Sequence, residues 1–262
     1  MNIVLQNLRQ QLILFFYALS YFTRVPIPRC IDFDDEQFHK ANVYLPLIGL
    51  GVALVMGGIF YVSQLIFSIP ISLILMLIGG LLLTGALHED GFADCCDGFG
   101  GGYNAAQRLK IMKDSQIGSY AGIGLVVLFI LKLNVLIELT AISYSSLFIA
   151  LLLAHTLSRY AALFIMQTLP YVRLDKQSKV QSLATKLPQG YFIFASLCAL
   201  SSLLLLSPAN AVSIVAISVI ATFILRQLFL KSLQGYTGDC LGFAQQCIEL
   251  IILLLLTVVL QA

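Results

Sequence analysis

The sequence predicts an all-α fold, namely a polytopic helix bundle that forms one membrane domain over residues 1–262. Hydrophobic residues make up 59% of the chain and charged residues only 11%, whereas charged residues are about 25% of an ordinary soluble domain. The mean hydropathy is +0.93. Several apolar runs approach the roughly 20 residues that a helix needs to cross a bilayer. Composition and run length therefore both indicate an integral membrane protein.

The first predicted helices lie in the N-terminal third of the chain. Residues 11–22 are apolar but short, so this helix is expected to lie in the membrane interface or to be only partly inserted. Residues 45–67 begin with Leu45-Pro46, and proline is favoured in the first turn of a helix. Residues 69–87 follow after a short polar break and form the second full-length segment.

Five further apolar segments follow, which brings the predicted number of spans to seven. They cover residues 119–138, 142–169, 191–206, 211–230 and 243–260. The 191–206 segment is the shortest and is marginal for a full crossing. With the short N-terminal helix, these segments account for most of the chain.

Loop charge predicts the orientation. Numbered from residue 45, the segments leave the connections 24–44, 88–118, 170–190 and 231–242 on one side, and the other connections hold no Lys or Arg. Because positively charged loops stay in the cytoplasm, we expect these four to be cytoplasmic and the protein to be a multi-pass protein of the cytoplasmic (inner) membrane. Their cations are Arg24, Arg29, Lys40, Arg108, Lys110, Lys113, Arg173, Lys176, Lys179, Lys186 and Lys231.

A block of acidic residues at 88–98 follows the second segment. Asp90, Asp94 and Asp97 are spaced i, i+4, i+7, so on a helix they fall within roughly 60° of one another. Clustered carboxylates repel each other unless a cation binds between them, and hard oxygen ligands suit Mg²⁺ or Mn²⁺. A solvated acidic turn at a helix start is the alternative, but it does not require this spacing. Gly91 would let a ligand approach the backbone.

Glycines and cations come directly after the acidic block. Gly100 and Gly101 belong to a run of three glycines, whose uncovered backbone N–H groups suit a phosphate. A plain flexible turn explains the run equally well. Arg108, Lys110 and Lys113 are candidates for binding phosphate oxygens, or they simply flank the next membrane segment.

Two further aspartates are candidate metal ligands. Asp114 stands just before the 119–138 segment, and Asp239 lies among glycines where the last segment opens. Together with the acidic block they give the predicted metal set, which is Asp90, Asp94, Asp97, Asp114 and Asp239.

Several charges lie inside apolar segments, where an unpaired charge is costly. Arg159 is expected to meet an anion, either a substrate phosphate or the carboxylate of Glu138 or Glu249. Glu249 itself needs a partner or a ligand. Lys132 and Arg226 are expected to snorkel toward the membrane surface.

These pieces indicate one chemistry at the cytoplasmic edge of the membrane. The carboxylates would hold Mg²⁺, and the cations and backbone amides would hold phosphate, as in phosphoryl or nucleotidyl-alcohol transfer. A carboxylate would also accept the proton of an attacking hydroxyl. Asp97 and Asp239 are the predicted catalytic proton acceptors, because each can sit at the edge of the cluster.

The motifs that carry this chemistry resemble cobalamin synthase, the adenosylcobinamide-GDP ribazoletransferase family. The resemblance implies a Mg²⁺-dependent membrane enzyme that joins adenosylcobinamide-GDP to α-ribazole or its 5′-phosphate. The products would be adenosylcobalamin, or its 5′-phosphate, and GMP. The matching segments are Thr23–Pro28, His88–Gly98, Met112–Ser115 with Gly118, Ser158–Arg159 and Gly235–Gly242.

Two other classes of protein remain open. Asp94–Gly98 resembles the opening of the CDP-alcohol phosphotransferase motif, which would indicate a phospholipid enzyme, but the Ala-Arg pair that should follow is absent. A cation-coupled transporter would also use carboxylates, although transporter sites lie near the membrane midplane and these acids lie at span ends. The net charge of +2 gives no indication of nucleic-acid binding. Membrane lipid is the expected surrounding partner, and a homo-oligomer is left open.

Overall fold

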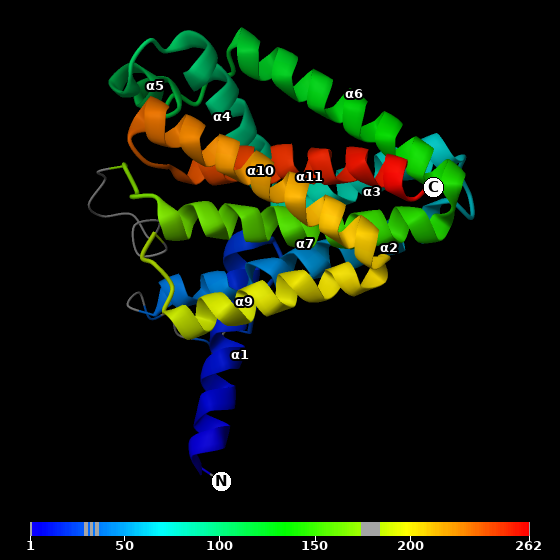
Figure 1. Cartoon of the computed structure of the whole chain (residues 1–262), viewed down its shortest axis with the longest axis horizontal. Coiled ribbons are helices and arrows are strands. Elements are labelled where there is room, and N and C mark those ends of the chain that lie inside the picture. Colours follow the sequence, from blue (N-terminus) through cyan, green and yellow to red (C-terminus); the bar gives the residue numbers. More distant parts are fainter. Residues whose placement is uncertain (1, 29–30, 32–33, 35–36, 174–183, 262) are drawn as a thin grey trace.

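The computed structural model describes residues 2–28, 31, 34, 37–173 and 184–261, and it confirms the all-α class. Most helices run side by side along the long axis of the molecule (Figure 1). The helices are α1 (Asn2–Phe22), η1 (Phe38–Tyr44), α2 (Leu45–Ser63), α3 (Ile69–Thr84), α4 (Leu87–Gly101), α5 (Ala105–Ile111), α6 (Ser119–Ile142), α7 (Tyr144–Thr168), α9 (Gln189–Ser201), η2 (Ser202–Leu205), α10 (Pro208–Leu233) and α11 (Gly238–Val259).

The number of full-length spans is smaller than the seven that the sequence predicts. In the described part of the chain, five helical segments are long and apolar enough to cross a membrane, namely η1 with α2, α6, α7, α10 and α11. Helices α3 and α4 pass this test only together, as a pair bent by 89°. The predicted 191–206 segment is a shorter apolar helix over Gln189–Leu205. Two of the seven predicted spans, 69–87 and 191–206, therefore do not pass this test as single helices.

The sharp bend between α3 and α4 has a local backbone cause. Gly85 (φ 65°) and Ala86 (φ 55°) are both left-handed, a conformation that ends a helix and that a residue with a Cβ rarely adopts. The backbone N–H of Arg24 donates to the carbonyl of Leu83 at 2.7 Å and fixes the end of α3 from outside. Since α4 carries four acidic residues, we treat it as lying beyond the membrane-spanning part of this pair.

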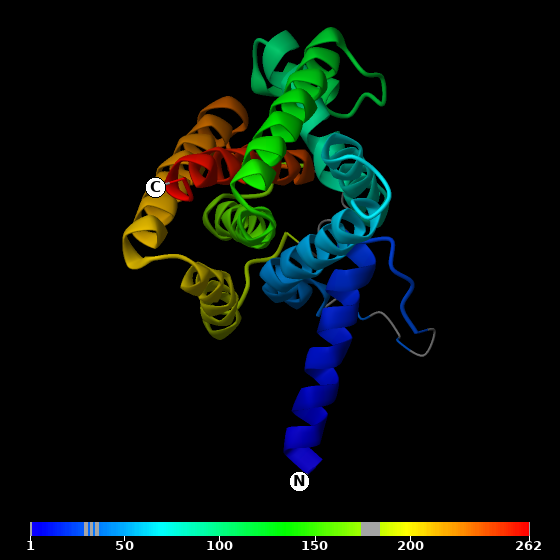
Figure 2. The ribbon, with the colours of Figure 1, turned by 90° about the vertical axis from the view of Figure 1, so that its right-hand side faces the viewer.

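The N-terminal helix is longer than the apolar run 11–22 predicts, because α1 begins at Asn2. Its C-terminal half packs against η1, with the rings of Tyr17 and Phe38 at 5.6 Å between centroids. Its N-terminal half extends away from the bundle, as both ribbon views show (Figures 1 and 2).

The polar connections gather at one end of the bundle. The segments that join α4 to α6 and α10 to α11 lie at the left in Figure 1, as does the C-terminal end of α7, whereas the short connections after α6 and η2 lie at the right. Helix α11 packs against both α7 and α4, so residues from the far C-terminal part of the chain reach the acidic block. Arg29, Lys176 and Lys179 of the predicted cytoplasmic cations lie outside the described residues.

Candidate active site

A cleft of about 600 Å³ at the polar end of the bundle brings the predicted metal ligands together. We call it the acid cleft. Helix α4, the α5–α6 connection and the start of α11 contribute its walls. All five predicted aspartates line it, which are Asp90, Asp94, Asp97, Asp114 and Asp239.

The spacing argument for the acidic block is correct, because residues 87–101 form one helix. Asp90, Asp94 and Asp97 all line the acid cleft from α4. Burial and the neighbouring carboxylates of Asp239 and Asp90 raise the pKa of Asp94 to about 7. The carboxylates in the cleft therefore repel one another, and a bound cation would relieve this repulsion.

Backbone contact between α4 and α11 brings Asp239 to this cluster. A Cβ on Gly91 would lie 2.9 Å from both Cα and O of Asp239, and a Cβ on Gly242 would lie 2.9 Å from the carbonyl oxygen of His88. Only glycine permits so close a crossing. The absence of a side chain at Gly91 therefore makes room for the start of α11 and not for a ligand, which corrects the expectation from sequence.

Arg173 is a site residue that motif reasoning missed. Its Nη2 lies 2.6 Å from Asp239 Oδ2 and also donates to the carbonyl of Met112 at 3.0 Å. The segment after α7 reaches this position through a parallel bridge in which Val172 N donates to Tyr236 O at 3.0 Å and Tyr236 N donates to Pro170 O at 2.9 Å. Arg173 counted only as loop charge in the sequence, because nothing local reveals that bridge.

Asp97 has a structural task that the sequence did not reveal. Its Oδ2 accepts from the backbone N–H of Gly118 at 2.6 Å, and its Oδ1 accepts from the N–H of Ala121 at 2.9 Å. These are N–H groups at the start of α6, which have no partner inside that helix. Asp97 therefore caps α6 from the neighbouring helix α4.

We expect Asp97→Asn to lower the stability of the protein by about 1–2 kcal/mol, because an amide cannot accept both N–H groups and carries no charge. Thermal unfolding of the purified protein in detergent measures this. Asp114→Asn is the matched control, since Asp114 is exposed and, within the described residues, accepts from Gln116 N alone, at 3.1 Å. Equal stability of the two variants would contradict the capping role.

The donor set fits a hard divalent cation in its chemistry, since five carboxylates line one cleft. In the present side-chain conformations, no three Asp, Glu, His or Cys groups among the described residues stand close enough together to hold a metal ion. Asp90 and Asp114 are exposed and Asp94 is half-buried, so these three are free of tight packing and can rotate.

The predicted phosphate ligands are spread more widely than the metal ligands. Lys113 lines the acid cleft, and Lys110 lines an adjoining hollow of about 540 Å³ that shares Lys113 and Asp114 with it. Arg108 lies apart, because its guanidinium donates to the carbonyls of Gly102 and Ser232 at 3.0 and 3.2 Å.

The glycine run is helical rather than an open loop. Gly100 and Gly101 lie in the last turn of α4. Their N–H groups therefore belong to the helix and are not open to a phosphate, which corrects the expectation from sequence. A Cβ on Gly100 would lie 2.5 Å from the ring of Tyr120. This glycine therefore serves close packing between α4 and α6.

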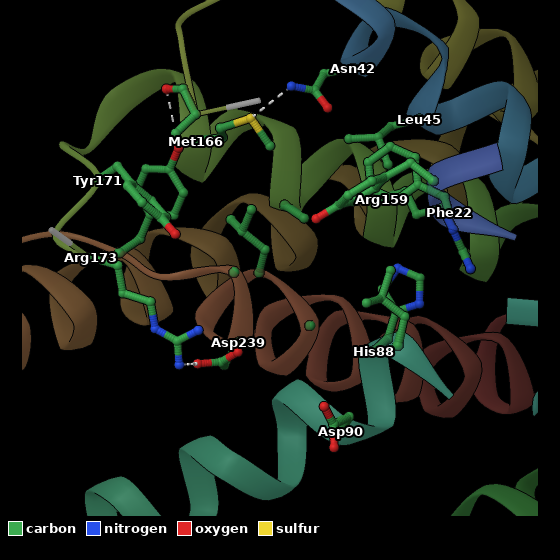
Figure 3. A pocket seen from close by; sticks show the side chains of 18 residues that line it. Phe22, Asn42, Leu45, His88, Asp90, Arg159, Met166, Tyr171, Arg173 and Asp239 are labelled. Carbon is green, nitrogen blue, oxygen red and sulfur yellow. Dashed lines mark hydrogen bonds and ion pairs between the residues drawn. The ribbon is translucent and has the colours of Figure 1, made fainter. Parts of the chain in front are cut away.

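A second space of about 240 Å³ adjoins the acid cleft (Figure 3). We call it the aromatic pocket, after Tyr21, Phe22, Tyr171 and Tyr236 in its wall. Arg159 lines this pocket and not the acid cleft. The two spaces share Asp90, Arg173 and Asp239, which form the partition between them.

A buried polar network runs from the acid cleft into the bundle. Glu249, 2% exposed, accepts from Lys132 Nζ at 2.7 Å, and its other oxygen lies 3.1 Å from His155 Nδ1. Lys132 also donates to Gln246, whose amide donates to Glu89 at the cleft wall at 2.8 Å. Lys132 is 3% exposed and does not snorkel, which corrects that expectation.

Among the described residues, Arg159 makes no direct ion pair with Glu138 or Glu249, although the charge of Glu249 lies near enough to act on it. Its Nη1 donates to the carbonyl of His155 at 3.1 Å and lies 3.2 Å from His155 Nδ1. Its Nε has no partner among the described residues, although the side chain is 2% exposed. Arg226 donates to Thr168.

The fold and the cleft define a membrane-embedded enzyme with a carboxylate-lined site. The family model described as cobalamin-5-phosphate synthase matches residues 14–257. The chain is 41% identical over 254 residues to an adenosylcobinamide-GDP ribazoletransferase of Vibrio cholerae (strain O395), covering 97% of each chain. It is 38% identical over 253 residues to the enzyme of that name from Shewanella amazonensis, covering 96% of this chain and 97% of the relative. No solved structure matches it. The chain belongs to the cobalamin-5-phosphate synthase family.

Proposed function

We propose that this enzyme is a transferase of cobalamin biosynthesis that joins adenosylcobinamide-GDP to α-ribazole, or to its 5′-phosphate, and releases GMP. The observation that carries the proposal is the acid cleft, in which five aspartates from α4, the α5–α6 connection and α11 meet. The relatives named adenosylcobinamide-GDP ribazoletransferase support the choice of substrates, because they match this chain over nearly its whole length.

The acid cleft suits a diphosphate and a divalent cation together. Asp90, Asp94 and Asp114 are the side chains that would hold Mg²⁺. When bound, Mg²⁺ would screen the charge on the two phosphates. Lys113 and Arg173 line the same cleft and supply fixed positive charge for phosphate oxygens.

The proposed reaction is a substitution at phosphorus. A ribose hydroxyl of the acceptor, which we take to be the 3′-hydroxyl, forms a bond to the phosphorus next to the cobinamide arm. The bond from that phosphorus to the bridging oxygen breaks, and GMP leaves with that oxygen. The hydroxyl proton passes to a carboxylate. Asp239 is the better candidate for this acceptor than Asp97, because Asp239 borders both spaces and both oxygens of Asp97 already accept N–H groups.

Release of GMP by purified protein in phospholipid vesicles tests the proposal. We expect GMP and the joined product in equal amounts when adenosylcobinamide-GDP, α-ribazole and Mg²⁺ are all present, and no GMP when either substrate or Mg²⁺ is omitted. Release of CMP from CDP-diacylglycerol and an alcohol would instead favour the phospholipid enzyme. Ion-driven uptake without GMP release would favour the transporter, and either result would overturn the proposal.

We also propose that the acid cleft faces the cytoplasm, as the loop charges predict. In a variant without native cysteines, Tyr103→Cys should react with a membrane-impermeant maleimide only after the cells are permeabilised. Tyr103 is 92% exposed near the cleft, so reagent access is not limited by packing. Ser68→Cys, in the opposite connection, should react in intact cells. Labelling of Tyr103→Cys in intact cells would refute this orientation.

A further inference from the structure

The aromatic pocket has no task in the phosphate chemistry described above. Its wall is largely apolar, and Tyr21, Phe22, Tyr171 and Tyr236 contribute rings or ring edges to it. It shares Asp90, Arg173 and Asp239 with the acid cleft as a common rim, and Figure 3 shows the ion pair between Arg173 and Asp239. A ligand in this pocket would therefore meet the reacting phosphates only at that rim.

The size of the pocket indicates which of the two substrates it can hold. Pockets for drug-sized molecules hold about 300–1,000 Å³, and this one holds about 240 Å³. A corrin ring with its side chains is far larger than such a space. A nucleoside with a flat bicyclic base is of the right order, and its apolar faces suit an aromatic wall.

A buried arginine also lies in the wall of the pocket. Arg159 lines the pocket at 2% exposure, and its Nε has no hydrogen-bond partner among the described residues. A buried N–H without an acceptor is costly, and because this Nε is almost fully shielded from solvent, a ligand acceptor would reach it only after the Arg159 side chain shifts toward the pocket. The base of α-ribazole is a dimethylbenzimidazole, which offers one such acceptor, its free ring nitrogen, and otherwise presents carbon.

We propose that the aromatic pocket binds the base of the nucleoside acceptor, with the ribose directed toward Asp239. This inference rests on the proposed function and adds the location of the second substrate. The donor diphosphate then occupies the acid cleft, and the acceptor hydroxyl arrives from the other side of the Asp90–Arg173–Asp239 partition. Attacking and leaving oxygens on opposite sides of the phosphorus are the arrangement that in-line displacement requires.

Two matched alanines allow a direct test. Ala162 lines the aromatic pocket and Ala93 lines the acid cleft, and each is 6% exposed. Ala162→Leu should raise the KM for α-ribazole about tenfold or more, since added methylenes in an apolar pocket discriminate by roughly this factor, and should leave the KM for adenosylcobinamide-GDP unchanged. Ala93→Leu should do the reverse. Ala162→Val, with a smaller effect of the same sign, replaces Ala162→Leu if the latter does not fold.

The acceptor itself supplies a second measurement. The riboside of unsubstituted benzimidazole lacks two methyl groups, so the KM penalty of Ala162→Leu should be several-fold smaller for it than for α-ribazole. An equal penalty for both acceptors, or a rise in the donor KM alone, would overturn the pocket assignment while the wild type still releases GMP. Absence of GMP release by the wild type would instead overturn the proposed function.

Discussion

Asp94→Asn is expected to lower turnover by at least about 10²–10³-fold while the protein still inserts and folds, because the lost charge lies at the centre of the acidic face of α4. Asp94 is half-buried and lies between Asp90 and Asp97 along α4. Its burial and the nearby carboxylates raise its pKa to about 7. An asparagine of the same shape keeps the packing but cannot supply the negative charge that a divalent cation needs. GMP release at saturating substrates measures the effect.

The control for Asp94→Asn is Glu138→Gln, which removes an exposed carboxylate near the other end of α6. That variant should retain near-normal GMP release. Elution of both variants as a single peak from size-exclusion chromatography would exclude unfolding as the cause. Near-normal activity of Asp94→Asn at ordinary Mg²⁺ concentration would refute the role of the cluster in holding the cation.

The acidic block could be predicted from sequence because its information is local. The i, i+4, i+7 spacing fixes one helix face whatever the rest of the chain does, and α4 presents that face to the cleft. Asp114 and Asp239 could also be predicted, because Asp114 stands just before a membrane segment and Asp239 lies among glycines where the last segment opens.

The contacts between distant segments could not be predicted in this way. Arg173 reaches Asp239 only through the bridge between Tyr171 and Tyr236, and Asp97 meets the start of α6 only after the chain has turned through α5. The bend at Gly85 and Ala86 was missed for a related reason. The hydropathy of 69–87 is continuous, whereas a left-handed alanine has no signature in composition.

Lys132 illustrates how burial reverses a sequence expectation. A lysine in an apolar helix ordinarily snorkels, but Lys132 is 3% exposed and lies 2.7 Å from Glu249, a residue 117 positions further along the chain. The network extends through Gln246 to Glu89 at the wall of the acid cleft. Helix α6 is thereby tied to α11 at the level where α11 supports the cleft.

Lys132→Met should destabilise the protein by about 3–5 kcal/mol, because it leaves the Glu249 carboxylate buried with fewer compensating charges. The double variant Lys132→Met/Glu249→Met should recover part of that loss, since the Glu249 carboxylate no longer has to be compensated, whereas the buried guanidinium of Arg159 loses that carboxylate's attraction. Denaturant unfolding in mixed micelles measures all three proteins. Arg226→Met is the matched control, because Arg226 is another cation of a membrane helix but is half-buried, donates to Thr168 and lies over the ring of Phe223, with no carboxylate paired to it among the described residues. Its cost should stay near 1 kcal/mol. A Lys132→Met variant as stable as Arg226→Met, or a double variant no better than Lys132→Met alone, would show that the pair does not hold α6 to α11.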